Sequence, residues 1–327
     1  MKLSIVIPLF NAGPFIRKCL TSCLVQDIPD DEYEIIVIDD GSTDNGPEEV
    51  QSVIDNNRNG VEIRMFSQDN SGLSVARNLG LLHSMGDYVW FVDSDDWIEE
   101  NCLHSLLEEV DDSDLLAFGM RNIDPAGLID SVFQYKNPGV WSGRDYILML
   151  NEKLKMCAPL FLFNRSSLTT NKICFFPGIF HEDVEFTPRA VFMAHDIVVS
   201  EKVPYNRLVH PGSITQTVNS KRPLDLVTVM ERLKVFRDDV AEDKDSFRSF
   251  NSIISNVAHM ACSLAETIPV NDREEFKSSV SRCRWLNKAL LNSQHLKYKI
   301  EGVLLSIMPG RLFEIHHFLM KFKRIFR

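Results

Sequence analysis

The stretch GDYVWFVDSDDWI, residues 86–98, decides the fold class of this chain. Its apolar run from Tyr88 to Val92 is typical of a strand buried on both faces, as in a parallel sheet covered by helices. Three similar runs precede it, at Leu3–Ile7, Glu34–Ile38 and Val61–Phe66, and helical stretches lie between them near 14–26, 46–57 and 72–84. Strands that alternate with helices predict an α/β fold with a mostly parallel central sheet flanked by helices.

Regularity decreases beyond residue 110. Residues 111–222 contain strand-like Leu115–Met120 and Pro159–Asn164 without a clean repeat, and we expect this part to shape a substrate pocket. From Pro223 onward, apolar residues recur at helical spacing, with stripes through 246–266 and 272–291. The sequence therefore predicts one α/β domain over 1–222, with halves 1–110 and 111–222, and a helical region over 223–327.

Composition describes a folded protein rather than a nucleic-acid binder. Of 327 residues, 44% are hydrophobic and 25% are charged, and the net charge is −11, which argues against a chain built to neutralise phosphate backbones. The seven cysteines are scattered and never spaced C-x-x-C, so neither a disulfide framework nor a zinc site is indicated, and we expect a reducing, cytoplasmic location. We expect no signal peptide and no transmembrane helix.

The last 32 residues carry a charge of opposite sign. Residues 296–327 have a net charge of +5, so the preceding residues carry −16. From Leu312 to Arg327, bulky apolar side chains are mixed with Lys and Arg, as in a basic helix that lies on a membrane surface. The alternative is a C-terminal helix packed on its own protein with a solvated basic face, and both interpretations stay open.

Carboxylates follow the fourth predicted strand. In an open α/β sheet, ligands bind beyond the carboxyl ends of the strands. Asp93-Ser94-Asp95 supplies the hard oxygens that Mg²⁺ or Mn²⁺ prefers, and the motif is a candidate clamp for a metal and a diphosphate. Asp96 precedes Trp97-Ile98-Glu99, and this D-x-x-E pattern predicts a helix capping box.

The first and second strands also end in polar segments, Pro8-Leu9-Phe10-Asn11 and Asp39-Asp40-Gly41-Ser42-Thr43-Asp44. Asp39 and Asp40 either cap a turn or accept a hydrogen bond from the ring of a uracil base. Arg77 lies in a predicted helix that opens at Ser71-Gly72, where it either pairs with a diphosphate or is a solvated surface residue. The motifs of dinucleotide dehydrogenases, P-loop ATPases, zincins and α/β-hydrolases are absent from the sequence.

Taken together, these segments resemble a known family. SIVIPLFN, EIIVIDDGSTD, NSGLSVARNLGL and GDYVWFVDSDDWI, in this order, are similar to the N-terminal half of bacterial glycosyltransferase family 2, which has the GT-A fold. Further on, residues 180–186, FHEDVEF, resemble the acidic E-D motif of that family. The resemblance makes 1–110 a nucleotide-binding half and 111–222 an acceptor half.

The resemblance implies an inverting transfer of a sugar from a nucleotide diphosphate donor, UDP-linked by expectation, to a hydroxyl of a polysaccharide, glycolipid or other glycan. Asp183 would be the general base, Asp95 and Asp93 would hold Mn²⁺ or Mg²⁺, and Arg207 or His210 could complete the leaving-group site. The residues expected to bind the nucleotide sugar are Pro8, Asn11, Asp39, Asp40, Gly72, Arg77, Asp93 and Ser94.

Two other functions remain as alternatives. A nucleotidyltransferase that makes nucleotide sugars has a similar architecture, although the Gly-rich basic loop expected for a triphosphate is missing. A non-catalytic nucleotide-sugar sensor is the other alternative. We expect the partners to be the donor and a glycan or lipid-linked acceptor, with peripheral contact at the inner face of the cytoplasmic membrane through the basic tail.

Overall fold

The chain folds into two compact units. A computed structural model describes residues 1–58, 60–150, 155–211, 213 and 218–325. The first unit comprises Met1–Arg144, Cys157–Gly178 and Ala190–Gln216, and the second comprises Asp145–Met156, Ile179–Arg189 and Thr217–Arg327. The predicted boundary between 222 and 223 stays a prediction, because the second unit also takes in two earlier segments.

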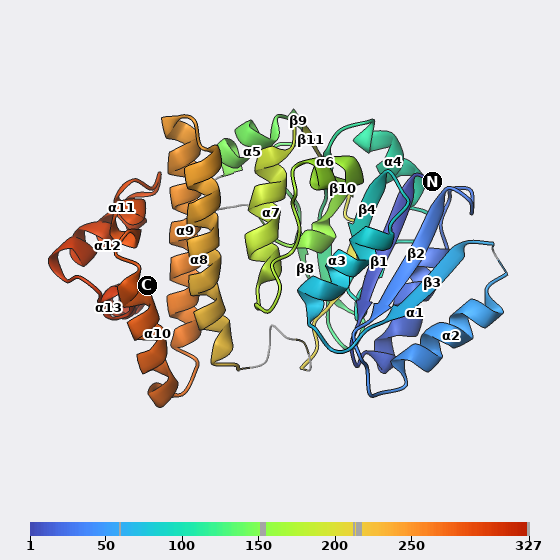
Figure 1. Cartoon of the computed structure of the whole chain (residues 1–327), viewed down its shortest axis with the longest axis horizontal. Coiled ribbons are helices and arrows are strands. Elements are labelled where there is room, and N and C mark those ends of the chain that lie inside the picture. The colour runs from blue at the N-terminus through green and yellow to red at the C-terminus, as the bar shows by residue number, and fades with distance from the viewer. Residues whose placement is uncertain (59, 151–154, 212, 214–217, 326–327) are drawn as a thin grey trace. The chain divides into compact units, whose positions relative to one another are not determined.

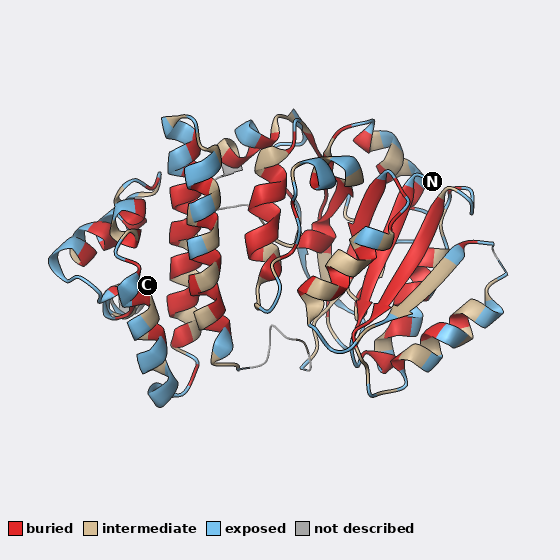
Figure 2. Ribbon diagram, viewed as in Figure 1, coloured by how far each residue is buried: buried red, intermediate tan, exposed pale blue. Residues whose placement is uncertain are grey.

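The first unit contains the predicted parallel sheet (Figure 1). Strands β1 (Leu3–Leu9), β2 (Tyr33–Asp39), β3 (Glu62–Ser67) and β4 (Tyr88–Phe91) are parallel and lie in the order β3-β2-β1-β4. Every residue of β1, β2 and β4 is buried, whereas β3 is half-exposed, as Figure 2 shows. Near-continuous apolar runs thus form strands covered on both faces.

Shorter strands extend this sheet beyond β4. They are β10 (Phe161–Asn164), β6 (Leu115–Ala117), β11 (Ile197–Val199) and β9 (Gly139–Trp141), in that order. β10 is antiparallel to both β4 and β6, and β11 is parallel to β6, so the eight-stranded sheet is mixed at this end. The predicted strand at 159–164 begins with a 3₁₀ turn at Ala158–Leu160.

Helices α1 (Gly13–Leu24), α2 (Gly46–Asn56) and α3 (Leu73–His83) connect the parallel strands, and α3 packs on β1 and β2. Gly80 permits this close packing, because a Cβ atom there would lie 2.2 Å from Cγ1 of Val6. Two shorter helices, α4 (Leu103–Val110) and α6 (Arg165–Thr170), complete the helices that lie wholly within this unit's described residues.

A second, four-stranded sheet differs from expectation. Its order is β5 (Trp97–Ile98), β12 (Tyr205–Leu208), β7 (Met120–Ile123) and β8 (Ile129–Phe133). The predicted strand 115–120 is divided between β6 and β7, and Gly119 lies at the break, where a Cβ would be 2.4 Å from the carbonyl oxygen of Phe133. The predicted capping box is wrong, because the residues after Asp96 pair with β12 instead of opening a helix.

The second unit is helical, as predicted from residue 223. Long helices α8 (Lys221–Val240) and α9 (Lys244–Ala265) lie side by side (Figure 1), and Asp243 caps α9 by accepting from the backbone N–H groups of Asp245 and Ser246. The remaining helices are α10 (Val270–Arg282), α11 (Leu286–Leu291), α12 (Leu296–Ile307) and α13 (Leu312–Ile325). The stripe at 272–291 is interrupted between α10 and α11. Helices α5 (Gly143–Leu150) and α7 (Glu182–Met193) belong partly to each unit.

The C-terminal tail packs on its own unit along the first turn of α13. The buried residues are Leu312, Phe313, Ile315 and His316. For this part of the tail, packing on the protein is therefore confirmed, and contact with a membrane surface is not available to these side chains. Lys323 and Arg324 lie where side chains are not described, and Arg327 lies outside the described residues. No helix among the described residues is both long and apolar enough to cross a bilayer.

Candidate functional site

Two carboxylates follow β4 at the edge of the parallel sheet. The side chains of Asp93 and Asp95 are each about one third exposed, at 34% and 31%, and Ser94 between them is half-buried. Asp93 accepts a 2.6 Å hydrogen bond from Nη2 of Arg77. Arg77 comes from α3 and is almost fully buried, and its guanidinium lies 5.2 Å from the ring centre of Phe175. The predicted Arg77 therefore faces the acidic motif and is not a surface residue.

Asp95 pairs with a residue that lies 115 positions further along the chain. Its Oδ2 atom is 3.0 Å from Nε2 of His210. The His210 ring in turn packs against Phe15 at the start of α1, with ring centres 4.7 Å apart. Burial, and then the neighbouring Asp93, raises the pKa of Asp95, while the contact with His210 opposes that rise. The predicted residue His210 thus joins the acidic motif, a result that its sequence position alone left open.

Asp96 has a structural role other than the predicted helix cap. It is buried, and it accepts hydrogen bonds from the hydroxyl of Tyr205 at 2.6 Å and from the backbone N–H of Leu208 at 2.8 Å. The backbone N–H of Asp93 donates to the Tyr205 hydroxyl oxygen at 3.2 Å. Tyr205 and Asp96 thereby join the acidic motif to β12, and no local pattern in the sequence pointed to Tyr205.

Asp40 holds the loop that opens α3. Its carboxylate accepts from the backbone N–H groups of Ser71 and Gly72, both at 2.8 Å, and from the side chain of Gln68 at 2.7 Å. Gly72 has a φ of +90°, which favours glycine, and open space where a Cβ would stand. Asp39 accepts from the backbone N–H of Ser42 through Oδ1 at 2.9 Å. The hydrogen bonds of Asp39 and Asp40 agree with the prediction that they stabilise turns. A hydrogen bond to a nucleotide base would be made in addition to these.

The loop after β1 is tied to the loop after β2. Asn11 has a left-handed backbone, with a φ of +50°, and its Oδ1 accepts from the backbone N–H of Thr43 at 2.8 Å. Its own backbone N–H donates to the Ser42 hydroxyl at 3.1 Å. Pro8 is buried within β1 beside Ile38. Asn11 and Pro8 thus shape the strand-end loops through the backbone.

The predicted base, Asp183, lies in the first turn of α7, within the second unit. The start of α7 is held by α8: the backbone N–H of Phe180 donates to Asp225 at 2.7 Å. The fully buried Glu185 pairs with Arg189 at 2.6 Å and with Arg232 at 2.9 Å. Free N–H groups in a first helical turn favour an ionised carboxylate, the form that a general base needs. Sequence and structure agree on the position of Asp183 at a helix N-terminus.

The donor set of the acidic motif fits a divalent cation. Asp93 and Asp95 offer hard oxygen atoms, and His210 offers an imidazole nitrogen next to Asp95. Arg207, the other predicted leaving-group residue, is half-buried on β12, three residues before His210.

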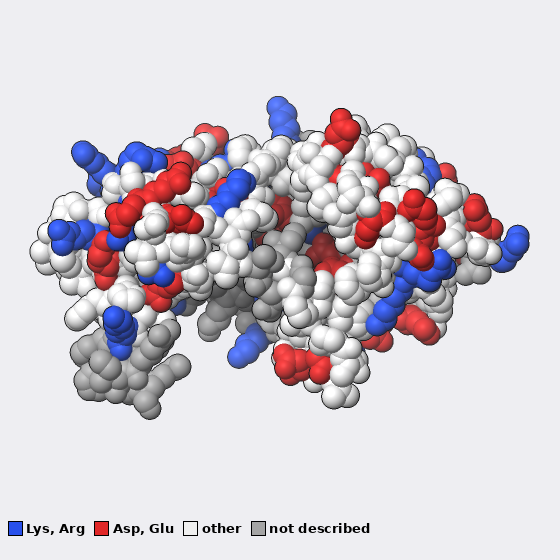
Figure 3. All heavy atoms as spheres, turned by 90° about the horizontal axis from the view of Figure 1, so that it is seen from below, with Lys and Arg blue, Asp and Glu red and all other residues white. Residues whose placement is uncertain are grey.

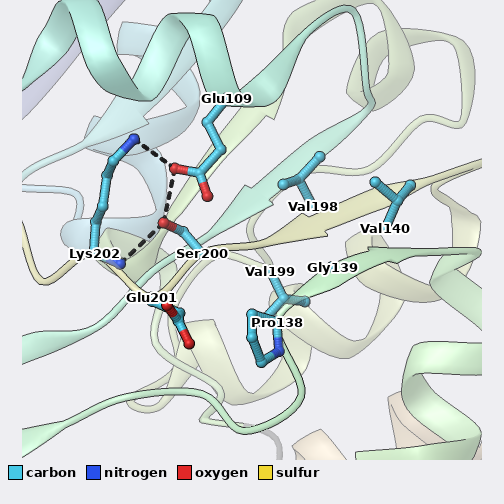
Figure 4. A pocket seen from close by; sticks show the side chains of 9 residues that line it. All are labelled: Glu109, Pro138, Gly139, Val140, Val198, Val199, Ser200, Glu201 and Lys202. Atoms are coloured by element: carbon cyan, nitrogen blue, oxygen red, sulfur yellow. Dashed lines mark hydrogen bonds and ion pairs between the residues drawn. The ribbon is translucent and has the colours of Figure 1, made fainter.

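Other surfaces of the first unit offer less chemistry. A pocket of about 620 Å³ lies beside β9 and β11 (Figure 4), but two of its charged residues, Glu109 and Lys202, pair with each other. Glu109 accepts from Lys202 at 2.7 Å and from Ser200 at 2.9 Å. On the face drawn in Figure 3, described Lys and Arg side chains alternate with Asp and Glu instead of forming one basic area, in agreement with the net charge of −11.

Comparisons with known proteins identify the family of this chain. A family model described as glycosyl transferase family 2 matches residues 4–169, which include the strand-end residues and end before Asp183. An uncharacterized glycosyltransferase YibD of Escherichia coli is 30% identical over 223 residues, which cover 66% of this chain and 63% of that protein. The poly(ribitol-phosphate) beta-N-acetylglucosaminyltransferase TarS of Staphylococcus aureus is 30% identical over 72% of this chain and 40% of its own length. The chain thus spans less than two thirds of these relatives.

Two solved structures share the fold. The crystal structure of S. aureus TarS 1–349 in complex with UDP-GlcNAc matches with a TM-score of 0.76 at 20% identity, over 98% of this chain and 92% of that one. A mannosyltransferase from Pyrobaculum calidifontis, in complex with GDP-Man and Mn²⁺, matches with a TM-score of 0.57 at 16% identity, over 97% and 86% of the two chains. These likenesses show a GT-A fold, as predicted.

Proposed function

Because the chain belongs to glycosyltransferase family 2, we propose that it transfers a sugar, with inversion, from a UDP-sugar to a hydroxyl of a cell-envelope glycan polymer or glycolipid. The observation that carries this proposal is the acidic motif at the end of β4, where Arg77 and His210 approach Asp93 and Asp95. TarS, a relative over 72% of this chain, is named for a transfer to poly(ribitol-phosphate), and its solved structure holds UDP-GlcNAc. These names support a UDP donor and a polymeric acceptor.

The nucleotide would lie over the carboxyl ends of β1, β2 and β4. Asp39 would read the base through Oδ2, since Oδ1 accepts from Ser42 and Asp40 already accepts from three donors. Arg77 would keep Asp93 oriented toward the ribose. The open space beside Gly72 lets a ligand approach the backbone at the start of α3, where free N–H groups favour an anion.

Asp93, Asp95 and His210 would hold Mn²⁺ or Mg²⁺. When bound, the metal supplies positive charge that offsets the charge developing on the departing diphosphate. Arg207 would add the positive charge of its guanidinium to the same site. No protein acid is then needed to protonate the leaving group, because a nucleoside diphosphate leaves as an anion.

Asp183 would take the proton of the acceptor hydroxyl. A sugar hydroxyl is a poor nucleophile, and a carboxylate within hydrogen-bond reach removes its proton as the new bond forms at the anomeric carbon. A single base that acts on the acceptor, with no second carboxylate as a nucleophile, gives inversion at that carbon. The hold of Glu185 on Arg232 would keep the first turn of α7 oriented for this step.

Titration calorimetry with UDP tests the donor site. We expect Mn²⁺-dependent UDP binding that is lost in Asp95→Asn and retained in Asp130→Asn, which removes the same charge from the exposed strand β8. Asp183→Asn should bind UDP like the wild type but lose sugar transfer by about 100-fold or more, since a general base typically contributes about 10²- to 10⁴-fold. UDP binding by Asp95→Asn at the wild-type affinity would contradict the metal role.

The two alternatives give different products. A nucleotidyltransferase would release pyrophosphate from UTP, whereas a glycosyltransferase releases UDP. A sensor would bind UDP-sugar without turning it over in the presence of any acceptor. A carboxylate at a helix N-terminus, Asp183, in a chain that also carries an intact acidic motif favours the transferase, since a binding module has no need of a base.

We also propose that the second unit rests on the inner face of the cytoplasmic membrane, where lipid-linked acceptors lie. The apolar surface that favours this belongs to α12 rather than to the start of α13. Leu296, Ile300, Val303 and Ile307 recur at helical spacing and are 47% to 73% exposed, and the exposed Lys297 and Lys299 lie among them.

Co-sedimentation with anionic vesicles at low salt tests the membrane contact. We expect the wild-type protein to sediment with phosphatidylglycerol vesicles and the Ile300→Glu/Ile307→Glu variant to stay in the supernatant. Leu82→Glu, which changes an equally apolar and exposed position on α3, is the matched control and should sediment like the wild type. Equal sedimentation of all three proteins would contradict the assignment to α12.

A further inference from the structure

A second cluster of metal-binding side chains lies within the helical unit. His259 comes from α9, Glu301 from α12 and His316 from α13. One ligand atom from each residue lies within 4.8 Å of the other two. The three residues span 57 positions of sequence, yet all of them could contact a single ion at once. None of them takes part in the glycosyl transfer proposed above.

Each of the two histidines has a ring nitrogen with no hydrogen-bond partner among the described residues. These atoms are Nδ1 of His259 and Nδ1 of His316, and both are buried. His316 is only 1% exposed, and its other nitrogen, Nε2, lies 3.3 Å from the hydroxyl of Ser263. When Nε2–H donates to Ser263, Nδ1 keeps its lone pair. Imidazoles that bind metals show this arrangement, in which one nitrogen donates to the protein and the other faces the ion.

Glu301 brings a buried negative charge to the same place. It is 5% exposed, and within the described residues its carboxylate contacts only Nδ1 of His259, at 3.5 Å and without a hydrogen bond. A nearby pair shows what an ordinary His–Glu contact looks like in this unit: His317 Nδ1 lies 2.9 Å from Oε1 of Glu266. Burial of a carboxylate and two imidazole nitrogens without mutual hydrogen bonds is costly unless a cation joins them.

We propose that His259, Glu301 and His316 bind one divalent transition-metal ion, of which Zn²⁺ is the best match. Two imidazole nitrogens and one carboxylate oxygen form a ligand set that zinc accepts, with a fourth position for water. The side chain of His259 is 27% exposed, which gives that water and the ion a route from solvent. The ion would join α9, α12 and α13 and so stabilise the fold of the helical unit.

Metal titration of the full-length protein tests the proposal, with the acidic motif of the first unit disabled by Asp93→Asn/Asp95→Asn. After removal of metal by chelation, we expect this protein to bind one equivalent of Zn²⁺, with a higher midpoint of thermal unfolding. We expect one equivalent of Co²⁺ to give the visible absorption bands of a low-coordinate site. Glu301→Gln, which keeps the size of the side chain, should lose both. Loss of a direct ligand should weaken Zn²⁺ by more than the roughly 10- to 100-fold cost of losing an outer partner.

Glu266→Gln is the matched control, because it removes the same charge from the His317 pair in the same unit and should leave Zn²⁺ binding unchanged. His259→Gln is a second test at a partly exposed position, should a variant at the buried His316 fail to fold. The proposal is overturned if the protein with a disabled acidic motif binds no Zn²⁺. It is also overturned if Glu301→Gln, folded by circular dichroism, binds Zn²⁺ as tightly as its parent.

Discussion

At the residue scale, charge pairs determine which carboxylates of the strand-end site are available to a ligand. Asp93 pairs with the buried Arg77, and Asp95 pairs with His210. Asp96 accepts hydrogen bonds from the Tyr205 hydroxyl and the Leu208 backbone and so has no part left for a ligand. Three neighbouring acids in one loop would repel one another in the folded state. The three distinct partners therefore allow the loop to fold while two carboxylates remain about one third exposed.

Arg77→Met tests the pair between Arg77 and Asp93. We expect it to lower the free energy of unfolding by about 1–3 kcal/mol, the cost of losing a hydrogen bond to a charged group, and to weaken UDP binding. Urea unfolding measures the first effect and calorimetry the second. In the Asp93→Asn background the same change should cost less stability, because no carboxylate is left unpaired. An equal cost in both backgrounds would show that Arg77 acts only through packing.

His181 makes stability depend on pH. It precedes α7, and Nε2 accepts from Nε of Arg222 at 3.4 Å. Burial, and then the charge of Arg222, lowers the pKa of His181 to about 4. Since the unfolded chain has a His pKa of roughly 6.5, the unfolded state gains a proton first as the pH falls. Stability is therefore unaffected above that value and is lost progressively between pH 6.5 and 4.

His181→Asn should remove this part of the acid sensitivity. Asn has no charge to gain and tolerates the left-handed backbone, with a φ of +63°, that His181 adopts. Between pH 7 and pH 5 the wild type should lose about 2 kcal/mol more stability than the variant. Urea unfolding at both pH values measures the difference. Parallel pH profiles for the two proteins would mean that His181 gains its proton in the folded state as easily as in the unfolded chain.

At the scale of elements, the approach of α3 to β1 positions Arg77. The helix begins at the Gly72 turn that Asp40 holds, and Gly80 lets it contact Val6 without a side chain between them. Helix and strand are thereby fixed at the two ends of the segment that carries Arg77. The position of the guanidinium is a property of this packing and not of the helix alone.

Gly80→Ala should move α3 away from the sheet. In an isolated helix the change would favour folding by about 1 kcal/mol, so any loss reports the tight contact with Val6. We expect a net loss of about 1–3 kcal/mol in urea unfolding, with weaker UDP binding. Val6→Ala in the same protein makes room for the new methyl group and should recover part of the loss. A Gly80→Ala protein that is more stable than the wild type would contradict the close packing.

At the scale of the whole molecule, the two units share secondary structure. The chain passes from one unit to the other at residues 144–145, 156–157, 178–179, 189–190 and 216–217, and α7 begins in the second unit and ends in the first. The residues that hold the start of α7, Asp225 and Arg232, lie on α8. The N-terminal part of the chain therefore depends on the helical region for the helix that carries Asp183.

Truncation after Ser220 tests this dependence. The shortened chain keeps Glu185, which is fully buried in the complete protein, but loses its partner Arg232. Glu185 keeps Arg189 but loses one of its two charge partners, and this loss, together with the apolar faces exposed by removal of α8 and α9, should give insoluble protein. Expression, solubility and far-ultraviolet circular dichroism measure the outcome. A soluble fragment that binds UDP with Mn²⁺ would instead support a self-contained domain over 1–222.

The sequence by itself determined the strands and helices of the parallel sheet and the edge at which its carboxylates lie. Alternation of apolar strands and helices predicts a parallel sheet, because such strands are buried on both faces and joined by helices. Since the carboxyl ends of parallel strands share one edge, Asp39, Asp40, Asp93 and Asp95 could be placed together without coordinates. Resemblance to the family supplied Asp183 in the same way, from a local motif.

Only the tertiary structure decided which distant side chains meet. His210 reaches Asp95 across 115 residues, Tyr205 reaches Asp96 across 109, and His259 meets Glu301 and His316 from three helices. Spacing along the chain records which residues share a face of one element. It carries no information on which elements pack together, because that choice depends on burying the apolar surface of the whole unit at once. The capping box predicted at Asp96 was wrong for this reason: a partner on β12 competed for the same carboxylate.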